Sequence, residues 1–465
     1  MSAPNPDKLP IDRACYWLDL HRREPRLTLR GARRADVVIV GAGYTGLWTA
    51  IHLLGLEPSL EIVIVDQGRV AYGGSGRNAG ILSDTIDHSH ALAIAHFGVE
   101  EAARLATLGR ANVAEMTSLL EARGIDCHLE RTGVITAALS DEHMQQLEES
   151  LACARSVGVT DWRLLGRDEM RAEIHSARYH GGLFNPAGAV LDPVRLADGL
   201  ADEATRLGAT LFEGSPVVAL EHEDGAVRVR TDGGEVRAQT CVLATSAYTH
   251  LLLPRTTFRF MPLYDYVRVS EPLTPAQHEA IGWRGRQGVN DARSFFNYYR
   301  LTADGRILWG TSEAAYYSPN RVGPAYDHSE RHYAELRTSL DEHFPELRDL
   351  ALPYAWGGAI CATTRFTPFF GKAMGGRVVY GLGFTGHGIG TTHLAGRVLA
   401  HLATHRHSPL LDLRLVRQMP FPYPPEPLRS WAVGLVTRAL RRVDAGQSPG
   451  ALLRMLDALG IGLSS

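Results

Sequence analysis

The sequence predicts an α/β protein organised around a Rossmann-like nucleotide-binding unit, with a second domain of the α+β type. The first observation is an apolar, β-branched run at residues 37–40 that leads directly into G-x-G-x-x-G, formed by Gly41, Gly43 and Gly46. Helical spacing follows at residues 47–54, and a second apolar run ends at Asp66. The second observation is a series of strand patterns late in a chain that is too long for one core.

Each part of this unit has a chemical purpose. The first glycine permits a tight turn, the second lets the backbone approach a pyrophosphate, and the third lets the helix pack on the strand. The helix N-terminus, with Tyr44 and Thr45 in its first turn, presents free N–H groups and a positive dipole end to phosphates. Asp66, with Gln67 beside it, stands where a carboxylate would accept a ribose hydroxyl.

Length and composition narrow the class further. At 465 residues we expect two domains plus extensions, and a formal net charge of -3 without a basic run gives no case for nucleic-acid binding. The expected partner is therefore a small molecule. No apolar stretch is long enough for a transmembrane segment or a signal peptide. The five cysteines are scattered without a C-x-x-C pair, so we expect reduced thiols in a cytoplasmic protein and no metal site.

Outside the opening unit, helical and strand patterns alternate. Helical spacing covers residues 91–123, 141–156, 193–208 and 333–344, and strand patterns cover residues 133–139, 215–222, 227–231, 235–243, 262–271, 306–311 and 377–382. Turn signals join the three strands between 215 and 243, so we expect a meander at the edge of the nucleotide-binding sheet. Residues 1–34 read as a surface extension, and the tail after residue 420 reads as proline-rich and then helical.

Two further glycine-rich loops, at residues 73–80 and 383–396, distinguish this chain from a simple nicotinamide enzyme. The second loop lies between a strand and a helix, which is another place where backbone N–H groups can face a ligand. A nicotinamide enzyme usually needs only the first glycine motif. Segments this far apart suit a larger, deeply buried cofactor, and flavin adenine dinucleotide (FAD) is the natural candidate.

The order of these motifs resembles the FAD-dependent D-amino-acid oxidase superfamily. The resemblance spans residues 15–410 and rests on VVIVGAGYTGLWTA from residue 37, VDQGRVAYGGSGRNAG from 65, GAVLDPVRLADGLADEA from 188, VLATSAYT from 242, AWGGAICATTRFTPFFG from 355 and YGLGFTGHGIGTTHLAG from 380. The S-G-R-N, W-G-G and G-H-G segments are most similar to the glycine oxidase-like and gamma-glutamylputrescine oxidoreductase-like branch.

This resemblance implies a Rossmann-like FAD-binding domain of the glutathione-reductase type and a discontinuous, mixed-sheet substrate domain. The FAD domain would comprise residues 35–95, 190–255 and 355–405, and the substrate domain residues 96–189 and 256–354. Residues 1–34 would form an N-terminal extension and residues 406–465 a C-terminal helical extension.

The resemblance also implies which residues hold the cofactor. The motif glycines and Asp66 would bind the ADP half, and Val217 would meet the adenine through its backbone. The flavin side would be lined by Ser75, Gly76, Arg77 and Asn78. The flavin pyrimidine edge would face a helix N-terminus, whose dipole stabilises negative charge on the reduced ring. The residues expected there are Gly386, His387, Gly388, Ile389, Gly390 and Thr391.

The implied reaction oxidises a C–N bond of an amine or amino acid by hydride transfer to the flavin, and water hydrolyses the imine. The amine must be neutral to react, and apolar walls favour loss of its proton. The candidates for those walls are Tyr264, Tyr266, Tyr298, Tyr299, Trp356 and Phe384, any of which could instead be ordinary core.

Four residues are the candidate catalytic set: Tyr298, Tyr299, Arg300 and His387. Arg300 could pair with a substrate carboxylate, which would favour an amino acid, or form a surface salt bridge. His387 is expected at the cofactor edge. A cationic amine would instead be favoured by acidic residues, for which the candidates are Asp265, Glu271 and Asp291.

Two departures from the family pattern affect the oxidant and the cofactor linkage. Leu308 stands where some members place a lysine that promotes reaction with oxygen, so either oxygen or another oxidant accepts the electrons. Some members bind the flavin through a cysteine, but that position aligns nearer Gly358 than Cys361, so we expect non-covalent FAD.

Two alternative functions stay open. One is a flavin-dependent monooxygenase, although its usual Gly-Asp motif does not occur here. The other is a flavin-binding subunit without catalysis.

Overall fold

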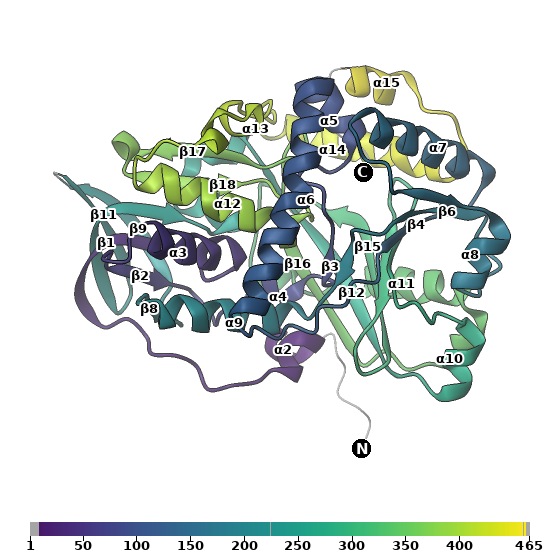
Figure 1. Ribbon diagram of the computed structural model, residues 1–465, viewed down its shortest axis with the longest axis horizontal. Coiled ribbons are helices and arrows are strands. Elements are labelled where there is room, and N and C mark those ends of the chain that lie inside the picture. Colours follow the sequence, from purple (N-terminus) through teal and green to yellow (C-terminus); the bar gives the residue numbers. More distant parts are fainter. Residues whose placement is uncertain (1–8, 224, 459, 462–465) are drawn as a thin grey trace.

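The computed structural model describes residues 9–223, 225–458 and 460–461, and its strands form two large sheets (Figure 1). The first eight residues of the expected N-terminal extension and the last four of the C-terminal one lie outside the described residues. Figure 1 shows the first sheet with its helices on the left and the second sheet on the right, with the long helix α6 (Val99–Ala122) running between them.

The first sheet has the Rossmann-like core that the glycine motif predicts. Its main path is β17 (Phe369–Ala373), β18 (Val378–Leu382), β11 (Gly234–Leu243), β1 (Gly31–Val40), β2 (Ile62–Val65) and β8 (Thr210–Phe212). Strands β10 (Ala226–Thr231) and β9 (Val217–Glu223) continue from β11 as an antiparallel meander. The expectation that the whole meander lies at the sheet edge was wrong for β11. Its second half is apolar and buried, and it pairs in parallel with both β1 and β18.

Helices cover one face of this sheet. Val37 and Ile39 of β1 pack in the same cluster as residues of α3 (Tyr44–Leu56), α9 (Pro193–Arg206) and α12 (Gly388–Ala403), whereas Val38 and Val40 pack in a cluster on the opposite face. This alternation is the period of two that a strand imposes on its side chains. The expected helix at 91–123 is divided into α5 (His90–Phe97) and α6, because Gly98 between them has a φ of 81°.

The second sheet combines segments from both halves of the chain. Its order is β16 (Tyr354–Ala362), β12 (Met261–Pro272), β15 (Arg306–Ala315), β14 (Asn297–Leu301), β13 (Gly288–Asp291), β4 (Val134–Ala138), β6 (Gly181–Asn185) and β5 (Arg163–Leu165). Strand β16, with which the last expected segment of the FAD domain begins, belongs to this second sheet. A small ladder of β3 (Ile81–Leu82) and β7 (Ala189–Val190) accompanies the two sheets.

The remaining helices flank the second sheet or connect elements. They are α4 (Gly74–Arg77), α7 (Asp141–Ser156), α8 (Arg167–Glu173), α10 (Pro275–Ile281), α11 (Glu330–His343), α13 (Arg414–Arg417), α14 (Leu428–Asp444) and α15 (Ala451–Ala458). The C-terminal extension is helical, as expected. In the part of the chain that the structure describes, no helix combines the length and apolar character needed to cross a membrane.

The first helices of the N-terminal extension are buried, contrary to the expectation that the extension lies on the surface, whereas its later part, which includes Leu27, is largely exposed. Its helices α1 (Ile11–Ala14) and α2 (Tyr16–Leu20) contribute Cys15, Tyr16 and Trp17 to the largest apolar cluster. The Trp17 indole Nε1 donates to the carbonyl of Asn78 (3.0 Å), and the Tyr16 hydroxyl donates to Asp304 Oδ1 (2.7 Å). The extension therefore joins the 73–80 loop to the second sheet.

Replacing Trp17 by alanine is expected to lower the free energy of unfolding by about 3–5 kcal/mol, because the side chain is 2% exposed and its removal leaves a large cavity. Denaturant unfolding measures the change. Leu27→Ala is the matched control, since Leu27 is 80% exposed and its loss should stay within about 0.5 kcal/mol. Equal effects of the two substitutions would contradict a structural role for α2.

Candidate active site

The glycine turn after β1 is built as the motif predicts. Gly41 has a φ of 110°, and a Cβ there would lie 2.6 Å from the carbonyl oxygen of Ala244. A Cβ at Gly46 would lie 2.0 Å from the carbonyl oxygen of Gly41, so only glycine lets α3 begin this close to the strand. Gly43 is the N-cap of α3, and Tyr44 and Thr45 lie in its first turn.

Asp66 fixes the loop where the ribose is expected. Its Oδ2 accepts from the N–H of Ala42 (2.7 Å) and its Oδ1 from the N–H of Gly68 (2.8 Å). Burial raises the pKa of Asp66 to about 6. The N–H of Ser215 donates to the carbonyl of Asp66 (2.7 Å), which brings the start of β9, and so Val217, toward this end of the site. The neighbouring Gln67 is exposed.

The S-G-R-N segment connects the glycine turn to the second sheet. Ser75 Oγ accepts from the N–H of Tyr44 (2.9 Å) at the N-terminus of α3. The Arg77 guanidinium is buried, pairs with Asp327 (2.8 Å) and donates to the carbonyl of Gly357 (3.1 Å) at the sheet edge. The Asn78 amide closes its own turn by donating to the carbonyls of residues 74 and 75. Gly76 packs so closely on Ala71 that a Cβ would lie 2.2 Å from its carbonyl oxygen.

The N-terminus of α12 carries buried polar atoms that make no hydrogen bond among the described residues. His387 is its N-cap, and His387 Nδ1 and Thr391 Oγ1 are buried without a hydrogen-bond partner among the described residues. Gly386 has a φ of 84°, and a Cβ there would meet no atom within 4 Å. Burial lowers the pKa of His387 to about 4, so its imidazole is neutral at physiological pH.

His88 is a neighbour of this helix terminus that the sequence did not indicate. Its Nε2 lies 2.9 Å from the carbonyl oxygen of Thr385, and its ring centroid lies 4.5 Å from that of His387. Burial lowers the pKa of His88 to about 3. The only signal was the largely polar stretch D-T-I-D-H-S-H from residue 84, a few residues after the glycine loop in the sequence.

Strand alternation separates the predicted aromatic residues into two groups. Tyr298 and Trp356 pack with the cluster that contains the FAD-domain core, together with Phe384 from the loop before α12. Tyr264, Tyr266 and Tyr299 lie in the cluster on the opposite side of the second sheet. The expectation that Tyr299 belongs to the catalytic set was therefore wrong, because neighbours in a strand point to opposite faces. Tyr264 and Tyr266 are ordinary core, which was the alternative left open for them. Tyr299 instead stacks on Trp309 with ring centroids 4.0 Å apart.

Tyr298 forms a buried pair with Asp265 on the face that meets the FAD domain. The Tyr298 hydroxyl donates to Asp265 Oδ2 (2.7 Å), and Asp265 Oδ1 accepts from the N–H of Tyr266 (2.8 Å). In the strand register Asp265 lies opposite Gly358, where a Cβ would be 3.4 Å from Arg77 Cδ. Burial raises the pKa of Asp265 to about 7.

Arg300 does not offer its guanidinium to a carboxylate. It is 2% exposed, and its Nη1 donates to the carbonyls of Gly80 (3.0 Å) and Leu191 (2.6 Å). It also lies over the ring of Trp17 at 5.8 Å. Both predictions for Arg300, a contact with a substrate carboxylate and a surface salt bridge, were therefore wrong. Arg300 instead holds the glycine loop against the N-terminal extension.

The other acidic candidates differ from Asp265 in their surroundings, and Leu308 and Cys361 lie in different apolar clusters. Asp291 pairs with Arg293 (2.6 Å), and Glu271 is exposed at the end of β12. Leu308 lies in the cluster between the sheet and the FAD domain. Cys361 is buried on the other side of the first sheet, and burial raises the pKa of its thiol, which agrees with a cysteine that does not attach the flavin.

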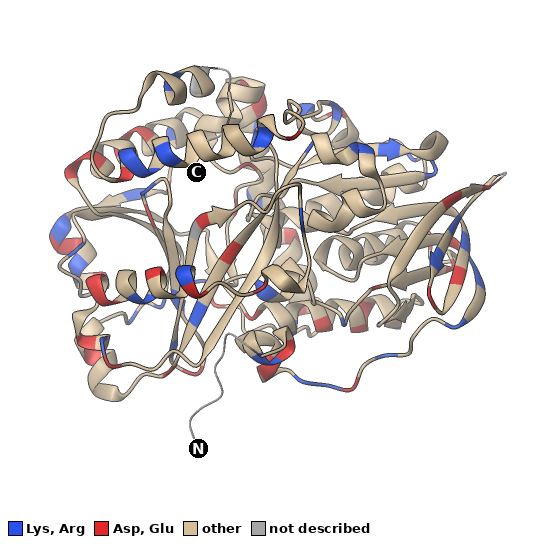
Figure 2. Ribbon diagram, turned by 180° about the vertical axis from the view of Figure 1, so that it is seen from behind, with Lys and Arg blue, Asp and Glu red and all other residues tan. Residues whose placement is uncertain are grey.

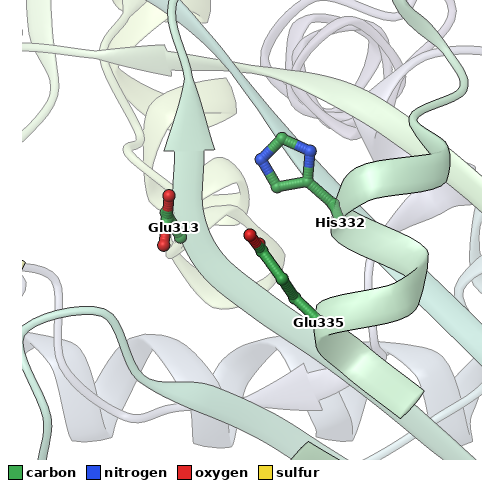
Figure 3. Close-up of side chains that lie close together, drawn as sticks. All are labelled: Glu313, His332 and Glu335. Carbon is green, nitrogen blue, oxygen red and sulfur yellow. The ribbon is translucent and has the colours of Figure 1, made fainter. Parts of the chain in front are cut away.

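Glu313 of β15 and His332 and Glu335 of α11 come close enough to suggest a cation site (Figure 3). However, Glu313 already pairs with Arg331 and with Arg441 of α14, and Arg331 also pairs with Glu335 (2.8 Å). Two guanidinium groups satisfy these carboxylates and repel a cation. The cluster therefore acts as an ion-pair network that attaches α14 to the second sheet.

A glycine-rich dinucleotide site whose inner end is covered by a second sheet defines a two-domain flavoprotein. The chain belongs to the family described as FAD dependent oxidoreductase, whose model matches residues 36–402. It is 30% identical over 390 residues to gamma-glutamylputrescine oxidoreductase of Escherichia coli strain K12, covering 83% of this chain and 88% of the relative. It is 29% identical over 394 residues to a probable oxidoreductase, OrdL, of Haemophilus influenzae, covering 83% and 86%.

Solved structures agree on the fold. Glycine oxidase from Geobacillus kaustophilus matches with a TM-score of 0.68 and 21% identity, covering 83% of this chain and 100% of that one. L-proline dehydrogenase from P. horikoshii matches with a TM-score of 0.65 and 19% identity, covering 84% and 98%. The predicted family, its flavoenzyme fold and its FAD cofactor are thereby confirmed.

The residues present fit FAD. Gly41 and Gly46 let α3 begin close to β1, and the small hydroxyl of Ser75 contacts the N-terminus of this helix, which suits a pyrophosphate. The partnerless atoms His387 Nδ1 and Thr391 Oγ1 at the start of α12 suit the polar edge of a flavin. Between these two ends lies the S-G-R-N segment, whose Ser75 contacts the first and whose Arg77 reaches the second sheet.

Proposed function

We propose that the protein oxidises a C–N bond of a cationic amine and that Asp265 anchors the positive charge of this substrate. The observation that carries the proposal is the buried Asp265–Tyr298 pair on the sheet face toward the FAD domain. The engagement of Arg300 with backbone carbonyls removes the group that would favour a substrate carboxylate. The name of the Escherichia coli relative, gamma-glutamylputrescine oxidoreductase, also indicates an amine.

Asp265 can supply both a counter-charge and a proton acceptor. Each of its carboxylate oxygens accepts one hydrogen bond in the structure and keeps a lone pair for an ammonium N–H. Its pKa of about 7 allows it to take up the ammonium proton near neutral pH. That transfer produces the neutral amine, whose nitrogen lone pair assists the loss of hydride from carbon.

The apolar residues around this pair favour the same step. Trp356 and Phe384 lie in the cluster between the domains, and their burial excludes water and lowers the pKa of a bound amine. The dipole of α12 places partial positive charge at its N-terminus, where negative charge would be stabilised. Bound FAD would supply the hydride acceptor for this oxidation, and water would hydrolyse the imine product.

For the oxidant, we propose an acceptor other than oxygen. Leu308 occupies the buried, FAD-facing position of β15 where oxygen-reactive relatives of this fold are expected to carry a lysine. A leucine supplies no positive charge to attract or stabilise superoxide next to a reduced ring. The match to the FAD dependent oxidoreductase family and to gamma-glutamylputrescine oxidoreductase also favours amine oxidation over the monooxygenase alternative.

Anaerobic mixing of the purified holoenzyme with putrescine, gamma-glutamylputrescine, glycine, sarcosine and D-alanine tests the function. We expect the flavin absorbance to bleach with the cationic amines and only weakly with the neutral-side-chain amino acids. On admission of air the colour should return slowly, and a quinone or dye should restore it faster. Bleaching by NADPH alone would indicate the monooxygenase. No bleaching by any amine would indicate a flavin-binding subunit without catalysis.

A further inference from the structure

The segment after residue 418 presents large apolar side chains to solvent. Five of them, together with Phe258, form what we call the C-terminal patch: Phe258, Met419, Phe421, Leu428, Trp431 and Leu435. Trp431 is 71% exposed and Phe421 70%, which is unusual for side chains of this size. An exposed group of this kind indicates an interaction surface.

These residues lie together although one of them is far away in the sequence. The N–H of Tyr423 donates to the carbonyl of Phe258 (2.8 Å), and Arg259 donates to the carbonyl of Pro420 (2.9 Å). Arg429, at the start of α14, is 3% exposed and donates to the carbonyl of Thr257 (2.9 Å). The segment before α14, its first turn and the 257–259 stretch therefore form one surface.

The apolar face of α14 is held in a fixed orientation. Leu428, Trp431 and Leu435 are spaced by three and four residues and so share one side of the helix. The other side is anchored, because Leu440 is buried and Asp444 accepts from the N–H of Ser294 (2.8 Å). The exposure of the patch is thus a property of the folded chain and not of a loose tail.

The charge around the patch is positive. Arg255, Arg438 and Arg442 are exposed and make no ion pair among the described residues. The acidic residues nearest the patch are engaged: Glu426 accepts from the hydroxyls of Tyr316 and Ser430, and Asp444 accepts from backbone N–H groups at the end of α14. On the side of the molecule seen in Figure 2, basic and acidic residues are otherwise interspersed.

We propose that the C-terminal patch docks on the surface of an anionic phospholipid bilayer. Trp431, Phe421 and the leucines would enter the boundary between head groups and acyl chains, where tryptophan is favoured, and the arginines would meet the phosphates. A second copy of the chain is a poorer occupant, because a twofold interface would bring each arginine face against its own copy. Docking of this kind needs no helix that crosses the membrane.

Co-sedimentation of the full-length holoenzyme with vesicles tests the proposal. We expect binding to vesicles of phosphatidylcholine with phosphatidylglycerol, at least tenfold weaker binding to phosphatidylcholine alone, and release by high salt. Trp431→Ser and Leu435→Ser should each weaken binding, and the double variant R438E/R442E should abolish the preference for phosphatidylglycerol. Leu27→Ser, an equally exposed apolar residue outside the patch, should bind like the parent.

The variants must keep the flavin content and melting temperature of the parent, which separates loss of docking from loss of folding. Brominated lipids should quench the fluorescence of the parent more than that of Trp431→Phe. The proposal is overturned if the parent protein binds neither kind of vesicle at low salt, or if Trp431→Ser binds as well as the parent. It is also overturned if the patch variants abolish a concentration-dependent dimer and leave vesicle binding unchanged.

Discussion

Asp265→Asn is expected to lower the rate of flavin reduction by an amine at least 100-fold at pH 8, since a positioned proton acceptor contributes about 10²–10⁴. In the parent, this rate should rise with pH through about 7, the pKa of Asp265, because only the ionised carboxylate binds the ammonium group and accepts its proton. Stopped-flow reduction under anaerobic conditions measures both effects. The variant should lose the rise near pH 7 and keep only the dependence set by the amine itself.

The same substitution should make the protein more stable at high pH. The folded pKa of Asp265 is raised, so the folded state binds its proton more tightly than the unfolded chain, and the penalty grows as pH rises from about 4 to about 7. Above pH 7 the penalty is on the order of 4 kcal/mol, at 1.36 kcal/mol per pKa unit. Asparagine carries no charge and so removes this penalty, and its side-chain oxygen can still accept a hydrogen bond from the Tyr298 hydroxyl.

Asp291→Asn is the matched control for both measurements. Asp291 is also buried but pairs with the partly buried Arg293, so its replacement removes an ion pair and lowers stability. It should leave the pH dependence of flavin reduction unchanged. A variant at Asp265 that is less stable at pH 8 but fully active would contradict the assignment, because the buried carboxylate would then serve structure alone.

Gly46→Val is expected to abolish FAD binding. A Cβ at this position would lie 2.0 Å from the carbonyl oxygen of Gly41, so α3 must move away from β1 and the turn that faces the pyrophosphate must open. The purified variant should be colourless, with a flavin-to-protein absorbance ratio near zero, and should unfold at a lower temperature than the parent.

Gly55→Ala in the same helix is the control for Gly46→Val. A Cβ at Gly55 meets nothing within 4 Å, and alanine is favoured over glycine within a helix by about 0.5–1 kcal/mol. This variant should therefore keep a full complement of FAD and be equally or slightly more stable. Normal flavin content in Gly46→Val would show that the first glycine motif does not hold the cofactor.

The fold was predictable where local pattern and long-range packing agree. The unit from β1 to β2 depends on short-range glycine geometry, so Gly41, Gly46 and Asp66 could be placed from the sequence alone. The position of β11 was predicted wrongly because its first half is polar and its second half apolar. This local pattern does not reveal that β10 pairs with the first half and β18 with the second. The burial of α2 also depends on partners far away in the sequence, such as Asp304, which lies 288 residues after Tyr16.

The substrate side of the site was harder to predict. The aromatic residues Tyr298 and Tyr299 were both plausible by composition, yet strand alternation allows only one of them to face the FAD domain, and the sequence does not say which. Arg300 looks like a ligand for a carboxylate until its contacts with the carbonyls of Gly80 and Leu191 are seen. Asp265 could be singled out only once the sheet register put it beside Tyr298.

The burial of the N-terminal extension has a consequence for biosynthesis. The Tyr16 hydroxyl donates to Asp304 and the hydroxyl of Tyr354 donates to Asp19 (3.2 Å), so α2 has these partners only after residue 354 has been synthesised. Contacts this distant in sequence form late and slow folding. Until then Trp17 and its neighbours are exposed apolar surface, so the nascent chain would depend on a chaperone or on slow translation to reach the state that binds FAD.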